Sequence, residues 1–169
     1  MSLHGDLLRQ ARHLATRESR RPKHASLRRA ISAAYYALFH LLIYEATTRL
    51  VTGRDRARLR QALGRAFAHA HMKEAAQGFA SNSLSLKMQP AIGELTLQPE
   101  LVSVAATFVD LQQARHEADY DTGRRFTRRE SLDLVDQAEQ AFADWHVVRH
   151  SLQADTFLVA LLVQRQMHS

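Results

Sequence analysis

Apolar residues recur along most of the chain at the three- and four-residue spacing of helices, and no segment alternates convincingly with period two. A first helix is predicted to carry Leu3, Leu7, Ala11 and Leu14 on its apolar face. It should end before Pro22, because the residue preceding a proline is pushed out of helical backbone. The pattern therefore predicts an all-α protein.

A second helix is predicted to begin with Ser26 as its N-cap and to run to about Val51. A helix that is apolar over so much of its circumference must be central in the fold or lie at an interface. Its two apolar stripes are Leu27, Ile31, Tyr35, Leu38 and Leu42, and Ala30, Ala33, Ala34, Ala37 and Leu41.

A third helix is predicted from about Asp55 to about Gly78. Its inward residues would be Leu59, Leu63, Ala66, Phe67 and Ala70. Residues 80–99, which contain two prolines and a glycine, are predicted to form an irregular loop. A loop of that length inside a compact domain is unusual enough to indicate mobility or function.

A fourth helix, with Pro99 in its first turn, has a core-facing stripe whose continuation reaches Arg115. The inward residues before it are Leu101, Val104, Phe108 and Leu111, and Ala118 follows. An arginine on such a stripe is costly unless it is paired or opens into a wet cleft. Arg115 is therefore predicted at the edge of a cleft, paired with Asp119 four residues later.

Residues 127–130 have the Thr-x-x-Glu spacing of a capping box, which predicts the start of a fifth helix. Its inner face would be Leu132, Val135, Ala138, Phe142 and Trp145. Residues 151–169 are predicted to be a C-terminal helical extension, which either continues this helix or packs separately. The whole chain, 1–169, is predicted to form one domain of five to six helices.

Composition agrees with a globular chain: 169 residues, 46% hydrophobic and 24% charged, are typical of one domain with a sizeable core. The absence of cysteine excludes disulfides, a cysteine nucleophile and thiolate metal sites. The N-terminus shows no secretory apolar segment, and the apolar run Ala30–Ile43 is shorter than the roughly 18 residues of a membrane span. We expect a cytoplasmic protein that makes no membrane contact.

The net charge is +6, and arginine supplies 20 of the 23 basic residues. The planar guanidinium fork suits carboxylates and phosphates, so this skew favours an acidic partner or nucleic acid. Basic residues gather in three tracts, over 9–29, 49–65 and 124–129. These tracts could form a surface that faces RNA.

Two segments collect residues that can carry chemistry: 28–40, which reads RRAISAAYYALFH, and 115–121, which reads RHEADYD. The first resembles the RRAxSxAYYAxFH helix of HEPN-domain proteins, and the second resembles the RxxADY element of the same family. These are small helical bundles often encoded beside nucleotidyltransferases. The resemblance spans roughly residues 1–150, with the two segments in the family's order and separation.

The resemblance implies an HEPN-like, up-and-down helical bundle that forms a homodimer, with a nucleotidyltransferase as a candidate partner protein. Many members of the family are metal-independent ribonucleases of toxin–antitoxin or defence systems. In these relatives an arginine and a histidine, separated by four to six residues, line a cleft at the dimer interface. The RxxADY match implies that Arg115 is that arginine.

The family's histidine is missing after Arg115, because Tyr120, Asp121 and Thr122 stand at the matching positions. Metal-free cleavage of RNA needs a group that transfers protons near neutral pH, which histidine does well and tyrosine poorly. His116 follows Arg115 directly, so a helix would point the two side chains about 100° apart.

These observations favour a nucleotide- or RNA-binding module, or a partner subunit, of a toxin–antitoxin or defence-type system. One alternative is a ribonuclease toxin in which Arg115 holds the phosphate while His116 or His40 transfers the proton. Another is a purely structural partner of a nucleotidyltransferase. The candidate catalytic residues are Arg115 and His116, and the candidate cleft residues are Arg29, Tyr36, His40, Asp119 and Tyr120.

No metal site and no cofactor are predicted. His146 and His150 have the spacing of the two histidines in a zinc-protease helix. Val147, however, occupies the position of the glutamate that such an enzyme uses as its base. The sequence therefore disfavours a metallopeptidase.

Overall fold

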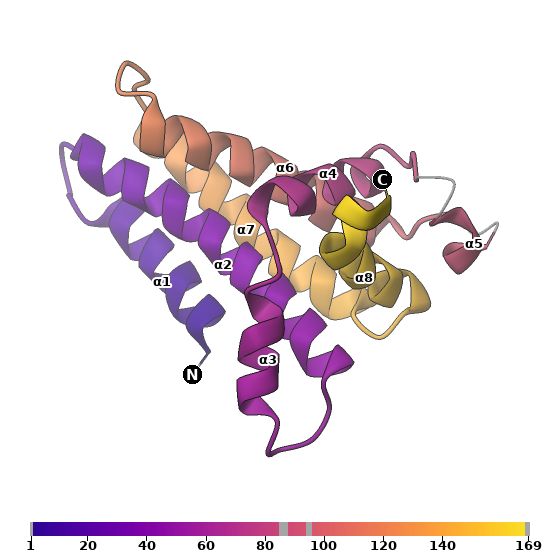
Figure 1. Cartoon of the computed structure of the whole chain (residues 1–169). Coiled ribbons are helices and arrows are strands. Elements are labelled where there is room, and N and C mark those ends of the chain that lie inside the picture. The colour runs from indigo at the N-terminus through magenta and orange to yellow at the C-terminus, as the bar shows by residue number, and fades with distance from the viewer. Residues whose placement is uncertain (1, 85–87, 94–95, 168–169) are drawn as a thin grey trace. The chain divides into compact units, whose positions relative to one another are not determined.

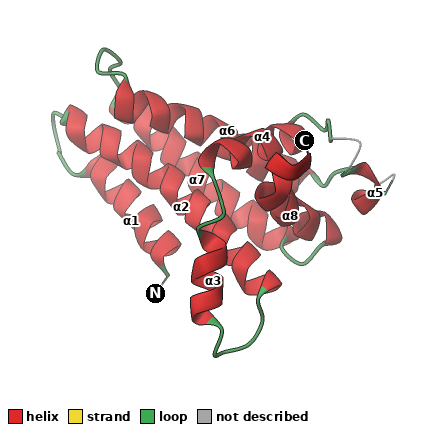
Figure 2. Cartoon of the chain, viewed as in Figure 1, coloured by secondary structure: helices red, strands yellow, loops and turns green. Residues whose placement is uncertain are grey.

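A computed structural model describes residues 2–84, 88–93 and 96–167, and every regular element in this part of the chain is an α-helix (Figure 2). The helices are α1 (Leu3–Thr16), α2 (His24–Leu50), α3 (Ala57–Gly64), α4 (His69–Ala80), α5 (Gln89–Ile92), α6 (Pro99–Tyr120), α7 (Arg128–Val148) and α8 (Leu152–Met167). The all-α prediction is confirmed. These eight exceed the five to six predicted, because the third helix is divided in two and α5 was not foreseen.

The described residues form two compact units, and α2, α6 and α7 each contribute residues to both of them. Unit 1 comprises residues up to 40 together with 107–143. Unit 2 comprises residues 41–106 together with those from 144 onward. No helix in the described part of the chain is long and apolar enough to cross a membrane.

Unit 1 packs α1, the first half of α2, the second half of α6 and most of α7. Figure 1 shows α1 lying beside the first half of α2. All ten residues of the two predicted stripes of α2, which extend into unit 2, are buried. The Tyr35 and Phe108 rings lie with centroids 5.6 Å apart, which joins α2 to α6. Burial of these apolar side chains is the main stabilising force in the unit.

The first helix ends before Pro22 as predicted, but two other details of the N-terminal helices differ from the prediction. α1 ends at Thr16, well before Pro22, and Leu3 is 58% exposed although it was predicted to face inward. α2 begins at His24, so Ser26 is not its N-cap. The reason is Glu18, whose carboxylate accepts from the Lys23 backbone N–H at 3.3 Å and from the Ser26 hydroxyl at 2.8 Å. A side chain from the preceding loop therefore accepts the hydrogen bonds of the polar groups at the start of α2.

The start of α7 matches the predicted capping box. The Glu130 carboxylate accepts from the Thr127 backbone N–H at 2.7 Å, and the Glu130 N–H donates to the Thr127 hydroxyl at 3.1 Å. The two residues thus satisfy each other's unpaired backbone donors. Of the predicted inner face, Val135, Ala138 and Trp145 are buried, whereas Leu132 and Phe142 are only partly so.

In unit 2 the predicted third helix is two helices, α3 and α4. α3 buries no residue, and Leu59 is 53% exposed. Of the five residues predicted to face inward, only Phe67 is buried, and it lies in the connection between the two helices. The break follows Gly64, where the backbone tightens: Arg65 N–H donates to the Ala62 carbonyl at 3.2 Å. Such short-range bonds end a helix.

The rest of unit 2 is held by α4 and α8, which pack against each other. The Phe79 and Phe157 rings meet at 4.9 Å between centroids. α8 is a separate helix rather than a continuation of α7, and the Ser151 hydroxyl oxygen accepts from the Ala154 N–H at 3.1 Å near its start. The predicted loop over 80–99 contains α5, and its residues 85–87 and 94–95 lie outside the described part.

Candidate functional site

Unit 1 contains a groove of about 500 Å³, a size typical of small-ligand sites. Three helices contribute to it, α1, α2 and α6. Its lining residues are Leu7, Gln10, Leu14, Arg29, Ser32, Ala33, Tyr36 and Asp119. The wall is thus mixed: aliphatic side chains from α1 face a set of polar and aromatic side chains from α2 and α6.

The α2 side of the groove follows directly from helical spacing. Arg29, Ser32 and Tyr36 are three and four residues apart, so one face of α2 presents all three. Arg29 is exposed, and its guanidinium makes no hydrogen bond or ion pair with any residue in the described part of the chain. An available cation therefore lies at a groove that also offers an aromatic ring.

Asp119 joins the groove to the core of unit 1. One carboxylate oxygen accepts from the Ser32 hydroxyl, and the other lies 3.6 Å from a terminal nitrogen of Arg115. The side chain of Asp119 is 26% exposed and that of Arg115 only 11%. The predicted pairing of Arg115 with Asp119 is therefore confirmed.

Arg115 itself is held behind the groove rather than among its lining residues. Its guanidinium carbon lies 5.1 Å from the Tyr35 ring centroid and 5.9 Å from that of Tyr36, within the range of cation–π attraction. Its Nε is buried and has no hydrogen-bond partner among the described residues. Burial raises the pKa of the Tyr35 phenol, with the charge of Arg115 opposing the shift. The arginine thus has a fixed position under Tyr36 and Asp119.

His116, predicted beside Arg115 as a catalytic residue, is exposed and does not line the groove. Its ring instead lies 5.1 Å, between centroids, from the ring of Tyr120. Tyr120 is 67% exposed and is likewise absent from the groove lining. Successive positions on α6 diverge, which separates this exposed pair from the face that Arg115 shares with Asp119.

His40, the remaining predicted cleft residue, contacts the groove indirectly. Its ring stacks on Tyr36 with centroids 6.2 Å apart and planes inclined by 29°. Burial lowers the pKa of His40 below its usual 6.5, and the charge of His4 adds to the shift. Burial at this position therefore disfavours the charged imidazolium.

The structure thus brings Arg29, Tyr36 and Asp119 together at the groove and leaves His40, His116 and Tyr120 out of its lining. Two kinds of lining residue were missed by sequence reasoning. Ser32 could have been found, because it shares a helix face with Arg29. The α1 residues, including Gln10, carry no local signal, since only tertiary packing brings α1 to this face of α2.

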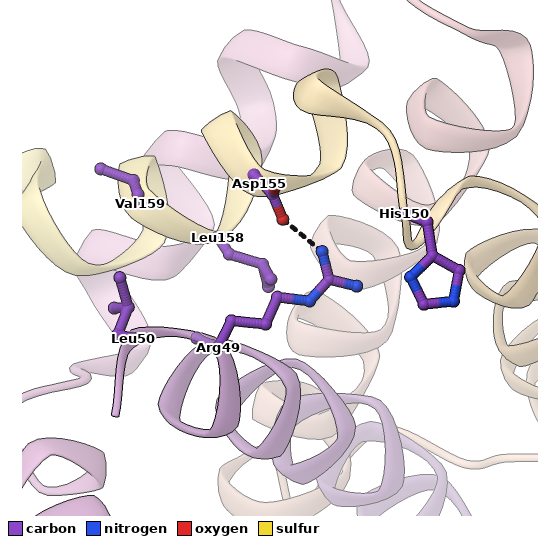
Figure 3. A pocket seen from close by; sticks show the side chains of 7 residues that line it. Arg49, Leu50, His150, Asp155, Leu158 and Val159 are labelled. Atoms are coloured by element: carbon purple, nitrogen blue, oxygen red, sulfur yellow. Dashed lines mark hydrogen bonds and ion pairs between the residues drawn. The ribbon is translucent and has the colours of Figure 1, made fainter. Parts of the chain in front are cut away.

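A second cavity, of about 470 Å³, lies in unit 2 and is lined by Ala46, Arg49, Leu50, His150, Asp155, Leu158 and Val159. Figure 3 shows the Arg49 guanidinium between Asp155 and the ring of His150, with Leu50 and Val159 farther along the cavity. Arg49 and Asp155 form an ion pair. The cavity therefore has an aliphatic end and a polar end, and at the polar end the Arg49 guanidinium is already paired with Asp155.

Glu45 supplies a second carboxylate beside the arginines of this cavity. Its side chain, 5% exposed, accepts from Arg149 at 2.7 Å and lies 3.2 Å from the second terminal nitrogen of Arg49. The Arg49 guanidinium also lies 5.9 Å from the ring centroid of Trp145. Arg49 and Arg149 are therefore both paired with carboxylates of unit 2. This network is best explained as a structural one, since its cations have little attraction left for a ligand anion.

A third, shallower groove, of about 350 Å³, lies in unit 1 and is rich in carboxylates. Arg124 already occupies it: the guanidinium pairs with Glu130 at 2.8 Å and with Glu117 at 3.5 Å, and lies 4.7 Å from the ring centroid of Phe126. The carboxylates Glu117 and Glu130 of this groove are therefore already paired with Arg124.

The described residues contain no cluster of three His, Asp or Glu side chains arranged to hold a metal ion. His146 and His150 do not share a helix, because α7 ends at Val148 and residues 149–150 form a turn. Comparisons of the chain with protein-family models, with curated proteins and with solved structures give no match. Functional inference therefore depends on the groove itself.

Proposed function

We propose that the protein is a nucleotide- or RNA-binding module that holds a phosphate and a base in the unit 1 groove and does not cleave the RNA. The observation that carries this proposal is the placement of Arg29. It is an exposed guanidinium with no partner in the described residues, on the same helix face as Ser32 and Tyr36. Arginine binds phosphate oxygens through two parallel donors.

The other lining residues suit the rest of a nucleotide. The Tyr36 ring offers a surface on which a base can stack, an interaction of about 1–3 kcal/mol per base. The Ser32 and Asp119 side chains add hydrogen-bonding groups for a sugar or a base edge. The aliphatic α1 wall, Leu7 and Leu14, would exclude water from the bound base.

Binding without cleavage is proposed because no imidazole lines the groove. His116 lies against Tyr120, and His40 lies behind Tyr36. Arg115 is committed to Asp119 and to two aromatic rings, so we assign it the role of positioning Asp119 and Tyr36. The resemblance to HEPN-domain proteins supports the same choice, since the histidine of their ribonuclease motif is missing here.

The test is fluorescence anisotropy with a short labelled single-stranded RNA, comparing the wild type with Arg29→Ala. A charge-assisted hydrogen bond contributes about 1.5–3 kcal/mol, so the substitution should weaken binding about tenfold or more. Arg129→Ala is the matched control, because Arg129 is an exposed arginine of unit 1 that lies outside the groove. It removes the same charge and should change the affinity far less.

The same samples, incubated in EDTA and resolved on a gel, decide between binding and cleavage. Intact RNA is expected after incubation with the wild type. RNA fragments that disappear with Arg115→Ala or His116→Ala would support the ribonuclease alternative instead. Equal weakening by Arg29→Ala and Arg129→Ala would mean that net charge, not the groove, governs binding. No binding by the folded wild type would favour a structural partner subunit.

A further inference from the structure

Residues 54–65 of unit 2 form a short, strongly basic segment that contains five arginines and one acid, Asp55. The arginines are Arg54, Arg56, Arg58, Arg60 and Arg65. The segment includes all of α3, which contributes no buried residue to the core. Packing within the described residues therefore does not account for its composition.

Four of these five guanidinium groups are unpaired. Arg54, Arg56, Arg58 and Arg65 are exposed, and their side chains make no hydrogen bond or ion pair with any described residue. The other arginines whose side chains are described in unit 2 behave differently: Arg49 pairs with Asp155 and Glu45, and Arg149 pairs with Glu45. The α3 segment thus concentrates four uncompensated positive charges.

The backbone that carries these charges is held in place. The fifth arginine, Arg60, donates to the carbonyls of Val51 at 3.0 Å and Gly53 at 2.8 Å, which fixes the connection that carries Arg54. At the other end, Gly64 lies close to α2: a Cβ there would meet the Ile43 side chain at 3.4 Å. The segment is therefore presented on a fixed support.

Two of the free charges lie on one side of α3. Arg58 and Arg65 are seven residues apart, which places them on nearly the same side of the helix and about 10 Å apart along it. Both guanidinium groups can therefore face the same polyanionic surface. Arg54 lies in the connection before the helix start.

We propose that residues 54–65 form a binding surface for the phosphate backbone of a double-stranded nucleic acid, separate from the unit 1 groove. The segment has no aromatic residue, so it lacks the stacking platforms that single strands use. Its one strongly exposed large apolar residue is Leu59, which is too little for the apolar core of a protein interface or for a membrane-bound helix. The surface therefore recognises negative charge rather than base sequence.

The test compares the wild type with the triple variant Arg54→Ala, Arg58→Ala and Arg65→Ala for binding to a short duplex DNA over a range of salt concentrations. Each phosphate contact contributes about 0.9 to the slope of log affinity against log salt. The variant should therefore bind more weakly, and its slope should be shallower by about three. Alanine is a good helix former, so α3 should persist, which circular dichroism can verify.

The control is the triple variant Arg17→Ala, Arg20→Ala and Arg129→Ala, which removes the same charge from exposed positions in unit 1. We expect it to keep a slope close to that of the wild type. A similar loss in both triple variants would overturn the proposal, because net charge would then explain binding. Absence of duplex binding by the wild type would also overturn it, as would binding by the same arginines to anionic vesicles but not to duplex.

The outcome can be separated from that of the proposed function. Arg29→Ala should leave duplex binding unchanged, because a duplex does not fit a groove of about 500 Å³. We expect Arg29→Ala to keep the wild-type slope of log affinity for duplex against log salt, and the α3 triple variant to show a reduced slope. Loss of duplex binding in Arg29→Ala would contradict the separation of the two surfaces.

Discussion

Glu45 should be one of the most stability-sensitive carboxylates in unit 2. It is 5% exposed and faces two guanidinium groups, Arg149 at 2.7 Å and Arg49 at 3.2 Å. Glu45→Gln removes the negative charge while keeping the shape. Breaking a buried ion pair on one side costs about 3–5 kcal/mol, because the remaining charge is left uncompensated.

The structure sets the expected cost below that range. Arg49 keeps Asp155 as a second partner, and the Arg149 side chain is 31% exposed, so water compensates part of the loss. We expect a loss of about 2–3 kcal/mol. For a chain of this length, each kcal/mol lowers Tm by about 2–4 °C, which gives a decrease of about 4–12 °C.

The assay is thermal unfolding followed by circular dichroism and by tryptophan fluorescence. Trp145 is the only tryptophan in the chain, and it lies in unit 2 within 5.9 Å of the Arg49 guanidinium, so its emission reports on this region. The control is Glu139→Gln, which breaks a surface pair with Arg12 whose side chains are 43% and 37% exposed. Exposed pairs contribute about 0–1 kcal/mol. Equal decreases in Tm for the two variants would refute the reasoning.

Three further predictions, one of them with its own control substitution, test separate parts of the fold. Hydrogen bonds, first from the Thr127 backbone and then from Arg124, lower the pKa of Glu130 from 4.5 to about 2. The ionised Glu130 carboxylate therefore stabilises the fold above about pH 4.5, and this stabilisation is lost as the pH falls toward 2. Glu130→Gln should therefore lower Tm at pH 6 but not at pH 2, and a gap that does not change with pH would contradict this. Gly53 has φ +103°, so Gly53→Ala should lower the free energy of unfolding in urea by about 1–2 kcal/mol, and an unchanged value would exclude backbone strain there. Phe126→Ala should lower the free energy of unfolding by about 3–5 kcal/mol in the same assay, because Phe126 is 5% exposed within an apolar cluster. The control, Tyr120→Ala, changes a side chain that is 67% exposed and should lower it by less than about 0.5 kcal/mol. Similar losses in the two variants would contradict the assignment of the core.

The buried faces of the long helices were predictable from the sequence. The stripe from Leu27 to Leu42 is buried as the periodicity indicates, because a helix of this length repeats the signal over several turns. The same periodicity placed Arg115 on a core-facing stripe and required a partner for it. Asp119 is that partner, at 3.6 Å.

The short elements were not predictable in the same way. Leu59 and Leu63 have helical spacing, yet the structure leaves Leu59 exposed and ends α3 after Gly64. Two turns give a weak periodic signal, and tertiary packing decides which side is covered. Ser26 failed as a cap for a related reason, since the competing carboxylate of Glu18 lies in the loop before the helix.

The candidate site was predictable only where it lies on one helix. Arg29 and Tyr36 share a face of α2, and the groove contains both. The α1 wall could not be foreseen, because it depends on how α1 packs against α2. His116 was placed near the site by its position in the sequence, but the helix directs it to Tyr120 instead. The homodimer and the partner nucleotidyltransferase stay predictions.

The most direct test of the groove is an NMR titration of the labelled protein with a nucleoside monophosphate. The Arg29 side-chain Nε–H and the backbone amides of Ser32 and Tyr36 should shift together with a single dissociation constant, because one bound nucleotide contacts all three. Arg29→Ala should abolish the shifts of Ser32 and Tyr36, while Arg129→Ala should preserve them. Shifts confined to residues around Arg49 and His150, or no shifts at all, would contradict the account.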